Sequence, residues 1–264
     1  MTDSLNLKKQ LILEKKGHIA LLTLNNPPAH TWTPESLLEL IDIVEGLNAD
    51  KDNYALVITG GGEKFFSAGA DLKRFDHDDK AKSFDFSNAF GRSFETLTNY
   101  NGVSIAAING FAMGGGLEVA LACDIRIAEA HAQMALPECA VGLLPCGLGS
   151  QHLSWLVGEQ WAKRMILLGE RLTADKALAI GLISELVDSG AVVEKALELA
   201  AKVENQSPTS VRYSKELIMA ARSQPLTTAF ATEREQFVKL WYSQDQKEGV
   251  SAFLEKRKPK WKND

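Results

Sequence analysis

Two glutamates of this 264-residue chain lie in apolar stretches, where a carboxylate is costly to bury. Glu118 is followed by Val-Ala-Leu-Ala-Cys, and Glu138 lies within Met-Ala-Leu-Pro-Glu-Cys-Ala-Val-Gly. Burial raises the pKa of a carboxyl group, and such groups concentrate at sites of acid–base chemistry. Each glutamate also has a plainer interpretation, as a favourable negative charge near the start of a helix.

A run of three glycines, residues 114–116, precedes Glu118 and follows an apolar, strand-like segment at residues 103–108. If a helix starts near Gly115, the N–H groups of its first turn have no acceptor within the helix and point outward. Glycine lets a ligand approach such N–H groups closely, so they can bind a carbonyl oxygen that gains negative charge. Alternatively, the run serves only tight packing of strand on helix. It is not a phosphate-binding loop of the Walker type, because no Gly-Lys-Ser/Thr follows.

The stretch Ser67-Ala-Gly-Ala-Asp-Leu-Lys offers a second loop of this kind, because it also follows an apolar run and a glycine cluster. The N–H of Ala70 is in a position to face that of Gly115. Two such donors beside two carboxyl groups suit proton transfer next to a carbonyl. As an ordinary strand-to-helix turn, the same stretch would use Asp71 only as a helix cap.

Short apolar runs alternate with segments of helical spacing, which predicts an α/β architecture of stacked ββα units. The expected strands are residues 11–14, 18–24, 54–59, 103–108, 125–128 and 133–136. Helices are expected at residues 34–47, 84–99, 115–122, 161–168, 174–180, 192–204, 210–222, 227–243 and 247–256, with a charged loop at 74–83 and almost only helix after residue 159. We place a domain boundary near residue 205, so that residues 1–205 form the core domain and 206–264 a helical region for oligomerisation or a lid.

The composition narrows the function classes. The chain has 29 basic and 34 acidic residues, a net charge of −5, which disfavours a general nucleic-acid binder. Its three cysteines form no Cys-x-x-Cys pair and its five histidines lack the spacing of zinc ligands, so we expect reduced thiols and no metal site. Neither a targeting peptide nor an apolar window of membrane-spanning length is found, so the expected compartment is the cytoplasm.

Several motifs in a fixed order resemble those of the enoyl-CoA hydratase/isomerase (crotonase) family, over nearly the whole chain. None is specific alone, whereas the combination is. The matching segments are Phe66–Lys73, Asn109–Glu118, Pro137-Glu138, Gly142–Pro145, Gly169-Glu170, Ala174–Ala177, Gly181-Leu182 and Ser251–Arg257.

The resemblance implies a crotonase-like spiral of ββα units with a C-terminal helical region that builds homotrimers, often paired into hexamers. It implies an oxyanion hole formed by the backbone N–H groups of Ala70 and Gly115, which would bind the thioester oxygen of an acyl-CoA. The residues expected to contact the substrate and its coenzyme A are Ala68, Ala70, Asp71, Leu72, Lys73 and Gly115. No metal or redox cofactor is implied, because coenzyme A is part of the substrate.

The same resemblance gives the two glutamates roles in hydrating a 2-trans-enoyl-CoA. Glu118 would deprotonate a water for attack at Cβ, and Glu138 would supply the proton to Cα. Family isomerases often keep only the counterpart of Glu138, so the pair favours hydration over Δ3-Δ2-enoyl-CoA isomerisation. A weakly catalytic acyl-CoA- or RNA-binding member is the other alternative, which the intact pair and the acidic balance disfavour. The acyl chain length and the pathway of fatty-acid metabolism stay open.

Two stretches depart from the usual family pattern, at residues 25–32 and 145–149. Four phenylalanines at helical spacing either form the acyl pocket or belong to the core, namely Phe84, Phe86, Phe90 and Phe94. The lysine-rich end, residues 256–262, is predicted to be a solvated tail rather than a contact for a coenzyme A phosphate. His30 and His77 are weighed as bases, but their neighbours indicate only surface or loop positions.

Overall fold

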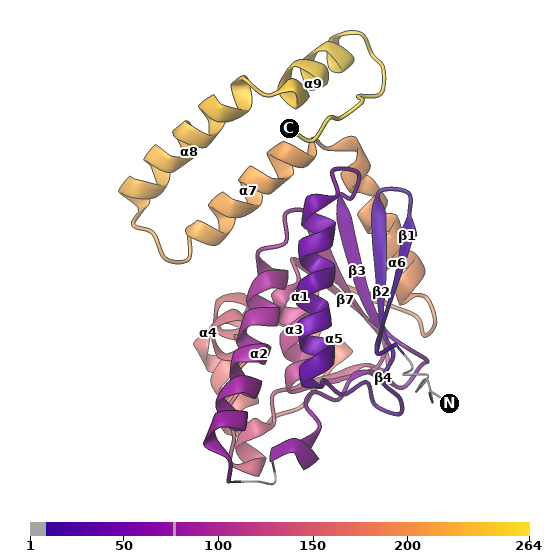
Figure 1. The fold of residues 1–264 in the computed structure, drawn as a ribbon, viewed down its shortest axis with the longest axis vertical. Coiled ribbons are helices and arrows are strands. Elements are labelled where there is room, and N and C mark those ends of the chain that lie inside the picture. Colours follow the sequence, from indigo (N-terminus) through magenta and orange to yellow (C-terminus); the bar gives the residue numbers. More distant parts are fainter. Residues whose placement is uncertain (1–8, 76–77) are drawn as a thin grey trace, which may run out of the picture.

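The computed structural model describes residues 9–75 and 78–264, and its centre is a six-stranded sheet (Figure 1). The strand order is β1-β2-β3-β5-β7-β10. The first two strands form an antiparallel hairpin, and all later neighbours in the sheet are parallel. The strands are β1 (Leu11–Lys16), β2 (Ile19–Leu24), β3 (Ala55–Gly60), β5 (Val103–Ile108), β7 (Ile125–Glu129) and β10 (Glu185–Val187).

A smaller sheet of four short strands lies beside the first and runs in the order β4-β6-β8-β9. Its strands are β4 (Phe65–Ser67), β6 (Phe111–Met113), β8 (Gln133–Ala135) and β9 (Leu172–Thr173). Along the chain, β3 and β4 precede helix α2 (Lys80–Thr98), β5 and β6 precede α3 (Gly115–Ala122), and β7 and β8 precede α4 (Gly149–Leu167). This repetition confirms the predicted α/β architecture of stacked ββα units.

Alternate residues of the central strands point to opposite faces of the large sheet, so each face has its own core. Leu56 and Ile58 of β3 are fully buried on the face that packs against α1–α4. Val57 of the same strand packs on the other face, which is covered by α6. The remaining elements of the body are α1 (Pro34–Ala49), α5 (Ala174–Ala179), α6 (Val192–Ala201) and the 3-10 helices η1 (Leu72–Phe75), η2 (Glu138–Val141) and η3 (Lys202–Asn205).

The helix α1 begins as its sequence predicts, with Thr33 as N-cap and Pro34 in the first turn. The Thr33 hydroxyl accepts a hydrogen bond of 3.2 Å from the Ser36 N–H. In contrast, α2 begins at Lys80, four residues before the predicted start, and the Asp79 carboxylate caps it. The prediction of a loop across residues 74–83 is therefore wrong for residues 80–83, which are helical. Asp76 and His77 lie outside the described residues.

Sequence periodicity fails where elements are short or interrupted. The strands β4, β6, β9 and β10 have two or three residues each and were not predicted. The last two make the expectation of helix almost throughout after residue 159 wrong. The helix α4 begins at Gly149, twelve residues before the predicted start, and Gly158 with φ 77° interrupts it.

Three helices of the C-terminal region extend away from the body (Figure 1). They are α7 (Pro208–Ala220), α8 (Leu226–Trp241) and α9 (Gln244–Leu254), close to the three predicted segments. None of the residues of α8 is buried. Among the described residues, no helix has both the length and the apolar character needed to span a membrane.

The C-terminal tail folds back and is fixed by its backbone. The Asp245 carboxylate, 1% exposed, accepts hydrogen bonds from the N–H groups of Lys262 (2.7 Å) and Asn263 (3.1 Å). The Trp261 indole donates to the Glu204 carbonyl at 3.1 Å. The lysine side chains of residues 256–262 are exposed, as predicted, but their backbone is part of the fold rather than a loose tail.

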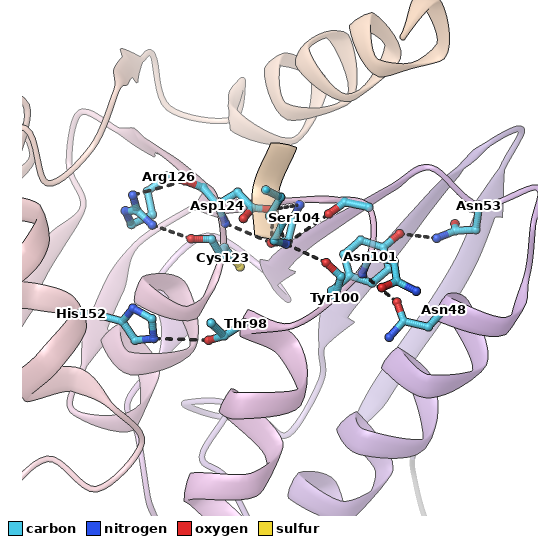
Figure 2. A network of polar contacts seen from close by, with 12 residues as sticks. Asn48, Asn53, Thr98, Tyr100, Asn101, Ser104, Cys123, Asp124, Arg126 and His152 are labelled. Carbon is cyan, nitrogen blue, oxygen red and sulfur yellow. Dashed lines mark hydrogen bonds and ion pairs between the residues drawn. The ribbon is translucent and has the colours of Figure 1, made fainter. Parts of the chain in front are cut away.

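A network of polar contacts joins α7 to the body, and Figure 2 shows its centre around Asp124, Ser104 and Tyr100. The Lys215 ammonium of α7 donates to Asp124 at 2.8 Å and to the carbonyls of Tyr100 (2.8 Å) and Gly102 (3.2 Å). Asp124 also accepts from the N–H (2.8 Å) and the hydroxyl (3.0 Å) of Ser104. One lysine thus connects the helix to two loops of the body, the one that follows α2 and the one that follows α3.

We expect Lys215→Met to lower the free energy of unfolding by about 1–3 kcal/mol, because Asp124 and two carbonyls would each lose a partner. The side chains of the ion pair are 13% and 25% exposed, so solvent replaces only part of that loss. Urea unfolding followed by circular dichroism gives the difference. Lys202→Met, at an exposed lysine of η3, is the matched control, and an equal effect of the two changes would contradict the prediction.

Candidate active site

The two predicted N–H donors, those of Ala70 and Gly115, lie on loops that touch. The strands β4 and β6 are parallel neighbours, so the segments that follow them leave the small sheet side by side. Gly69 has φ +85°, and a Cβ atom there would lie 3.0 Å from the Gly115 nitrogen and 2.7 Å from the Met113 oxygen. Only glycine therefore fits at position 69, and this close contact of the two loops brings the Ala70 and Gly115 N–H groups together.

The peptide planes that carry these donors are held by their carbonyl groups. The Gly69 carbonyl accepts a hydrogen bond of 2.8 Å from the Trp32 N–H. The Gly114 carbonyl accepts from the N–H groups of Leu117 (2.7 Å) and Glu118 (2.9 Å). In a planar trans peptide the C=O and N–H bonds point in opposite directions. Fixing each carbonyl therefore fixes the N–H of the next residue, Ala70 or Gly115.

Glu118 lies in the first turn of α3 and is 2% exposed. Its Oε1 accepts hydrogen bonds from the N–H groups of Gly147 (2.8 Å) and Gly149 (2.9 Å), just before and at the start of α4. A Cβ at position 149 would lie 2.7 Å from that oxygen, so the close approach requires glycine.

The environment of Glu118 favours its protonated form. The pKa of Glu118 is raised to about 7, mainly by burial. The charge of Glu138 adds to the rise, and the hydrogen bonds from Gly149 and Gly147 oppose it. A carboxyl group with this pKa changes its charge close to neutral pH, which suits a group that exchanges a proton with substrate.

Glu138 begins the 3-10 helix η2, directly after β8 and Pro137. Its Oε1 lies against the glycine loop, since a Cβ at position 114 would be 2.9 Å from it. Burial also raises the pKa of Glu138. Both carboxyl groups therefore resist ionisation, and they lie beside the same pair of N–H donors.

All four predicted groups line one cavity of about 710 Å³. Its apolar wall includes Phe86, Phe90, Met113, Val141, Leu143 and Leu144. Of the four phenylalanines proposed for an acyl pocket, Phe86 and Phe90 are on this wall. Phe94 is fully buried in the core and packs edge-on against Phe90, and Phe84 is 67% exposed. Two of the four phenylalanines thus line the cavity, and their role as an acyl pocket stays a prediction.

Only some of the predicted coenzyme A contacts line the cavity. Ala68, Ala70 and Leu72 line the cavity together with Gly115, whereas Asp71 and Lys73 lie outside its lining. The Asp71 carboxylate accepts a hydrogen bond of 3.2 Å from the Lys73 N–H, in keeping with the alternative capping role. In the described part of the chain, no three His, Cys, Asp or Glu side chains come together as metal ligands.

Three features of the site were not found from the sequence. The N–H groups of Gly147 and Gly149 donate hydrogen bonds to Glu118. Cys146, which precedes Gly147 in the sequence, lines the cavity. The departure of residues 145–149 from the family pattern was the only signal at these positions. His30 lies in a turn, as its interpretation as a loop residue predicted, but it is 7% exposed and so is not a surface residue. His77 lies outside the described residues.

Comparisons with known proteins agree with this geometry. The model of a family described as "Enoyl-CoA hydratase/isomerase" matches residues 14–264. A short-chain-enoyl-CoA hydratase of Clostridium acetobutylicum is 37% identical over 94% of this chain and 95% of its own. The structure of Pseudomonas aeruginosa DspI is 58% identical, with a TM-score of 0.94 over 99% of this chain and 100% of that one. An enoyl-CoA hydratase of Bacillus anthracis is 32% identical, with a TM-score of 0.92 over 97% and 100% of the two chains.

The raised pKa of Glu118 predicts a pH-dependent stability that Glu118→Gln should remove. The folded protein binds this proton more tightly than the unfolded chain, whose ordinary value is 4.5. The stabilisation is therefore complete below that pH and is lost as the pH rises to about 7. We expect the variant to gain up to about 3 kcal/mol relative to the wild type between about pH 4 and pH 8.

Urea unfolding at a series of pH values measures this difference, and only the change in the difference with pH reports on Glu118. Glu45→Gln, at an exposed position of α1, provides the control with a constant difference. A difference for Glu118→Gln that stays constant over the same range would contradict the prediction.

Proposed function

The chain belongs to the enoyl-CoA hydratase/isomerase family, as its motifs predicted, and we propose that it adds water across the 2,3 double bond of a 2-trans-enoyl-CoA. The product is a 3-hydroxyacyl-CoA, which makes the protein a hydro-lyase. Relatives over most of its length are named as hydratases, such as the short-chain-enoyl-CoA hydratase of Clostridium acetobutylicum. The observation that carries the proposal is the presence of one buried and one half-buried glutamate, Glu118 and Glu138, in one cavity with two oriented N–H donors.

The N–H groups of Ala70 and Gly115 bind the thioester oxygen of the substrate. Attack of water at Cβ moves negative charge onto this oxygen, which becomes enolate-like. Donors that are already oriented stabilise this charge more in the transition state than in the ground state. The hydrogen-bonded carbonyls of Gly69 and Gly114 support this assignment, because they keep both donors in place before the substrate arrives.

The two glutamates hold the attacking water between them. Glu118, as a carboxylate, orients this water and takes a proton from it while the oxygen bonds to Cβ. Glu138, in its protonated form, donates its proton to Cα, and burial favours this form because it raises the pKa of Glu138. A base with a pKa of about 7 is well matched to neutral pH, since it is ionised often enough and still binds a proton well.

The proton balance closes within the pair. After one turnover Glu118 carries the proton taken from water and Glu138 is ionised, so the next turnover begins once the proton has returned to Glu138. The two glutamates supply the proton transfer, and the N–H groups of Ala70 and Gly115 supply the charge stabilisation. The proposed reaction therefore needs no metal or redox cofactor, and coenzyme A takes part only as a portion of the substrate.

The rest of the substrate follows from the position of its thioester. Coenzyme A extends from the cavity along residues 68–73, where Ala68, Asp71, Leu72 and Lys73 are proposed contacts together with Ala70. The acyl chain lies on the apolar wall at Phe86 and Phe90.

We expect Glu118→Gln and Glu138→Gln each to lower kcat for hydration by about 10²–10⁴-fold, because each removes one proton-transfer step. The loss of the conjugated thioester absorbance of crotonyl-CoA measures the rate, with Glu45→Gln as the active control. Full activity in Glu118→Gln would overturn the two-glutamate mechanism. The variant Glu118→Ala tests the alternative function, because it should abolish hydration but leave an isomerisation that needs only one base. If it still isomerises a 3-enoyl-CoA, Glu138 acts alone as the base of an isomerase.

We also propose that the chain forms a homotrimer, or a hexamer of two trimers, through its C-terminal helices. In α8, Phe230, Phe237, Val238 and Trp241 are each more than half exposed. Their spacing places them on one face of the helix. A face of this kind is unfavourable in water, and a second copy of the chain is the partner that the helical region 206–264 would provide.

The double change Phe237→Glu and Trp241→Glu should therefore dissociate the oligomer into monomers, as buried carboxylates would oppose association. Sedimentation velocity measures the molecular mass in solution. Lys239→Glu, on the opposite face of α8, adds a similar charge and should leave the oligomer intact. A wild-type protein that sediments as a monomer would exclude this assembly.

A further inference from the structure

The segment Ala29–Trp32 packs along the loop that carries the Ala70 donor. The Ala68 N–H donates to the Ala29 carbonyl at 2.9 Å, and the Trp32 N–H donates to the Gly69 carbonyl at 2.8 Å. These bonds flank His30, whose own carbonyl accepts a hydrogen bond of 2.7 Å from a buried hydroxyl at position 67. The loop is thus bonded to this segment on both sides of His30.

His30 has a backbone conformation that is unusual for a residue with a side chain, with φ +52°. Its imidazole Nε2 donates to the Gly61 carbonyl at 2.7 Å, at the end of β3. The ring packs tightly there, since a Cβ at position 61 would lie 3.3 Å from its Cε1. His30 is 7% exposed, so the imidazole is buried, while its bond to Gly61 is part-buried. The imidazole therefore holds the left-handed turn in place.

The turn at His30 determines which groups of the segment face the loop. The His30 carbonyl points to the hydroxyl of Ser67, which in turn accepts a hydrogen bond of 3.2 Å from the Gly69 N–H. Two residues later the Trp32 N–H reaches the Gly69 carbonyl. Both polar groups of Gly69 are thus bonded through this segment. Its carbonyl belongs to the peptide whose N–H is the Ala70 donor.

From this arrangement we propose that His30 is a positioning residue for the oxyanion hole, and the proposal rests on the function proposed above. Its imidazole fixes the Ala29–Trp32 segment, the segment fixes the plane of the Gly69–Ala70 peptide, and the plane fixes the direction of the Ala70 N–H. The hydrogen bond to the Gly69 carbonyl also polarises the N–H of the same peptide and makes it a stronger donor. His30 does not touch the substrate and is not a catalytic residue.

Removal of the imidazole should therefore affect the transition state more than substrate binding. Loss of a whole oxyanion donor typically costs about 10²–10³-fold in kcat, and a misplaced donor costs part of that. We expect His30→Ala to lower kcat by about 10–100-fold, with a change in KM of less than about threefold.

Two variants separate the imidazole from the backbone conformation. His30→Gly allows the left-handed turn without strain but removes the side chain, so the proposal expects it to lose as much kcat as His30→Ala. His131→Ala is the control, because that imidazole also bonds a carbonyl, that of Glu63 at 3.0 Å, but it is exposed and does not line the cavity. Wild-type kcat in His30→Gly would overturn the role of the side chain.

Amide hydrogen exchange, read by mass spectrometry on a peptide spanning residues 66–72, tests the same proposal without any activity. We expect its exchange to accelerate at least about tenfold in both His30 variants, while a peptide of β5, residues 103–108, keeps its protection. Exchange that rises equally in both peptides would mean general destabilisation and would overturn the proposal. Unchanged exchange at residues 66–72 would overturn it as well.

The two readouts also separate this proposal from the proposed function. A wild-type protein that hydrates no enoyl-CoA would refute the function, and the exchange of residues 66–72 would still report on the position of the Ala70 peptide. An active wild-type protein with unaffected His30 variants would refute only the role of His30.

Discussion

The burial of the Glu118 carboxyl group is the constraint on which the rest of the site depends. A carboxylate that is 2% exposed needs hydrogen bonds, and two backbone N–H groups at residues 147 and 149 provide them. These groups reach the carboxyl oxygen only because both positions are glycine. The start of α4 is thereby tied to the first turn of α3. Two consecutive ββα units are thus joined at the cavity by one side chain.

The small sheet serves the same purpose on the other side of the cavity. Its strands have only two or three residues each, but β4 and β6 are parallel neighbours and so deliver two loops side by side. Their close approach at Gly69 and Gly115 leaves no room for a side chain. Donors fixed in this way lose little entropy when a ligand binds, which is the advantage of an oxyanion hole built from backbone rather than side chains.

Much of the architecture could be predicted from the sequence, because long elements carry strong patterns. The capped start of α1 at Thr33 and Pro34 and the buried strand at residues 103–108 are examples. The motifs also predicted that Ala70, Gly115, Glu118 and Glu138 belong to one site, and all four line the same cavity. The residues that hold these groups in place could not be predicted, because Gly147, Gly149 and His30 act through contacts with residues distant in sequence. Strands of three residues are likewise too short to show a period.

The site and the C-terminal region meet different physical demands. In the body, apolar side chains fill both faces of the large sheet and the polar groups of the site are held by backbone contacts. In α8 no residue is buried, so its apolar face cannot be explained by the fold of one chain. Lys215 joins these two parts through an ion pair to Asp124 and two carbonyls of the body. Glu118 lies in the first turn of α3, and Asp124 follows its last residue by two positions. An assembly formed by α8 would therefore connect to the cavity through α7, the ion pair with Asp124 and this single short helix.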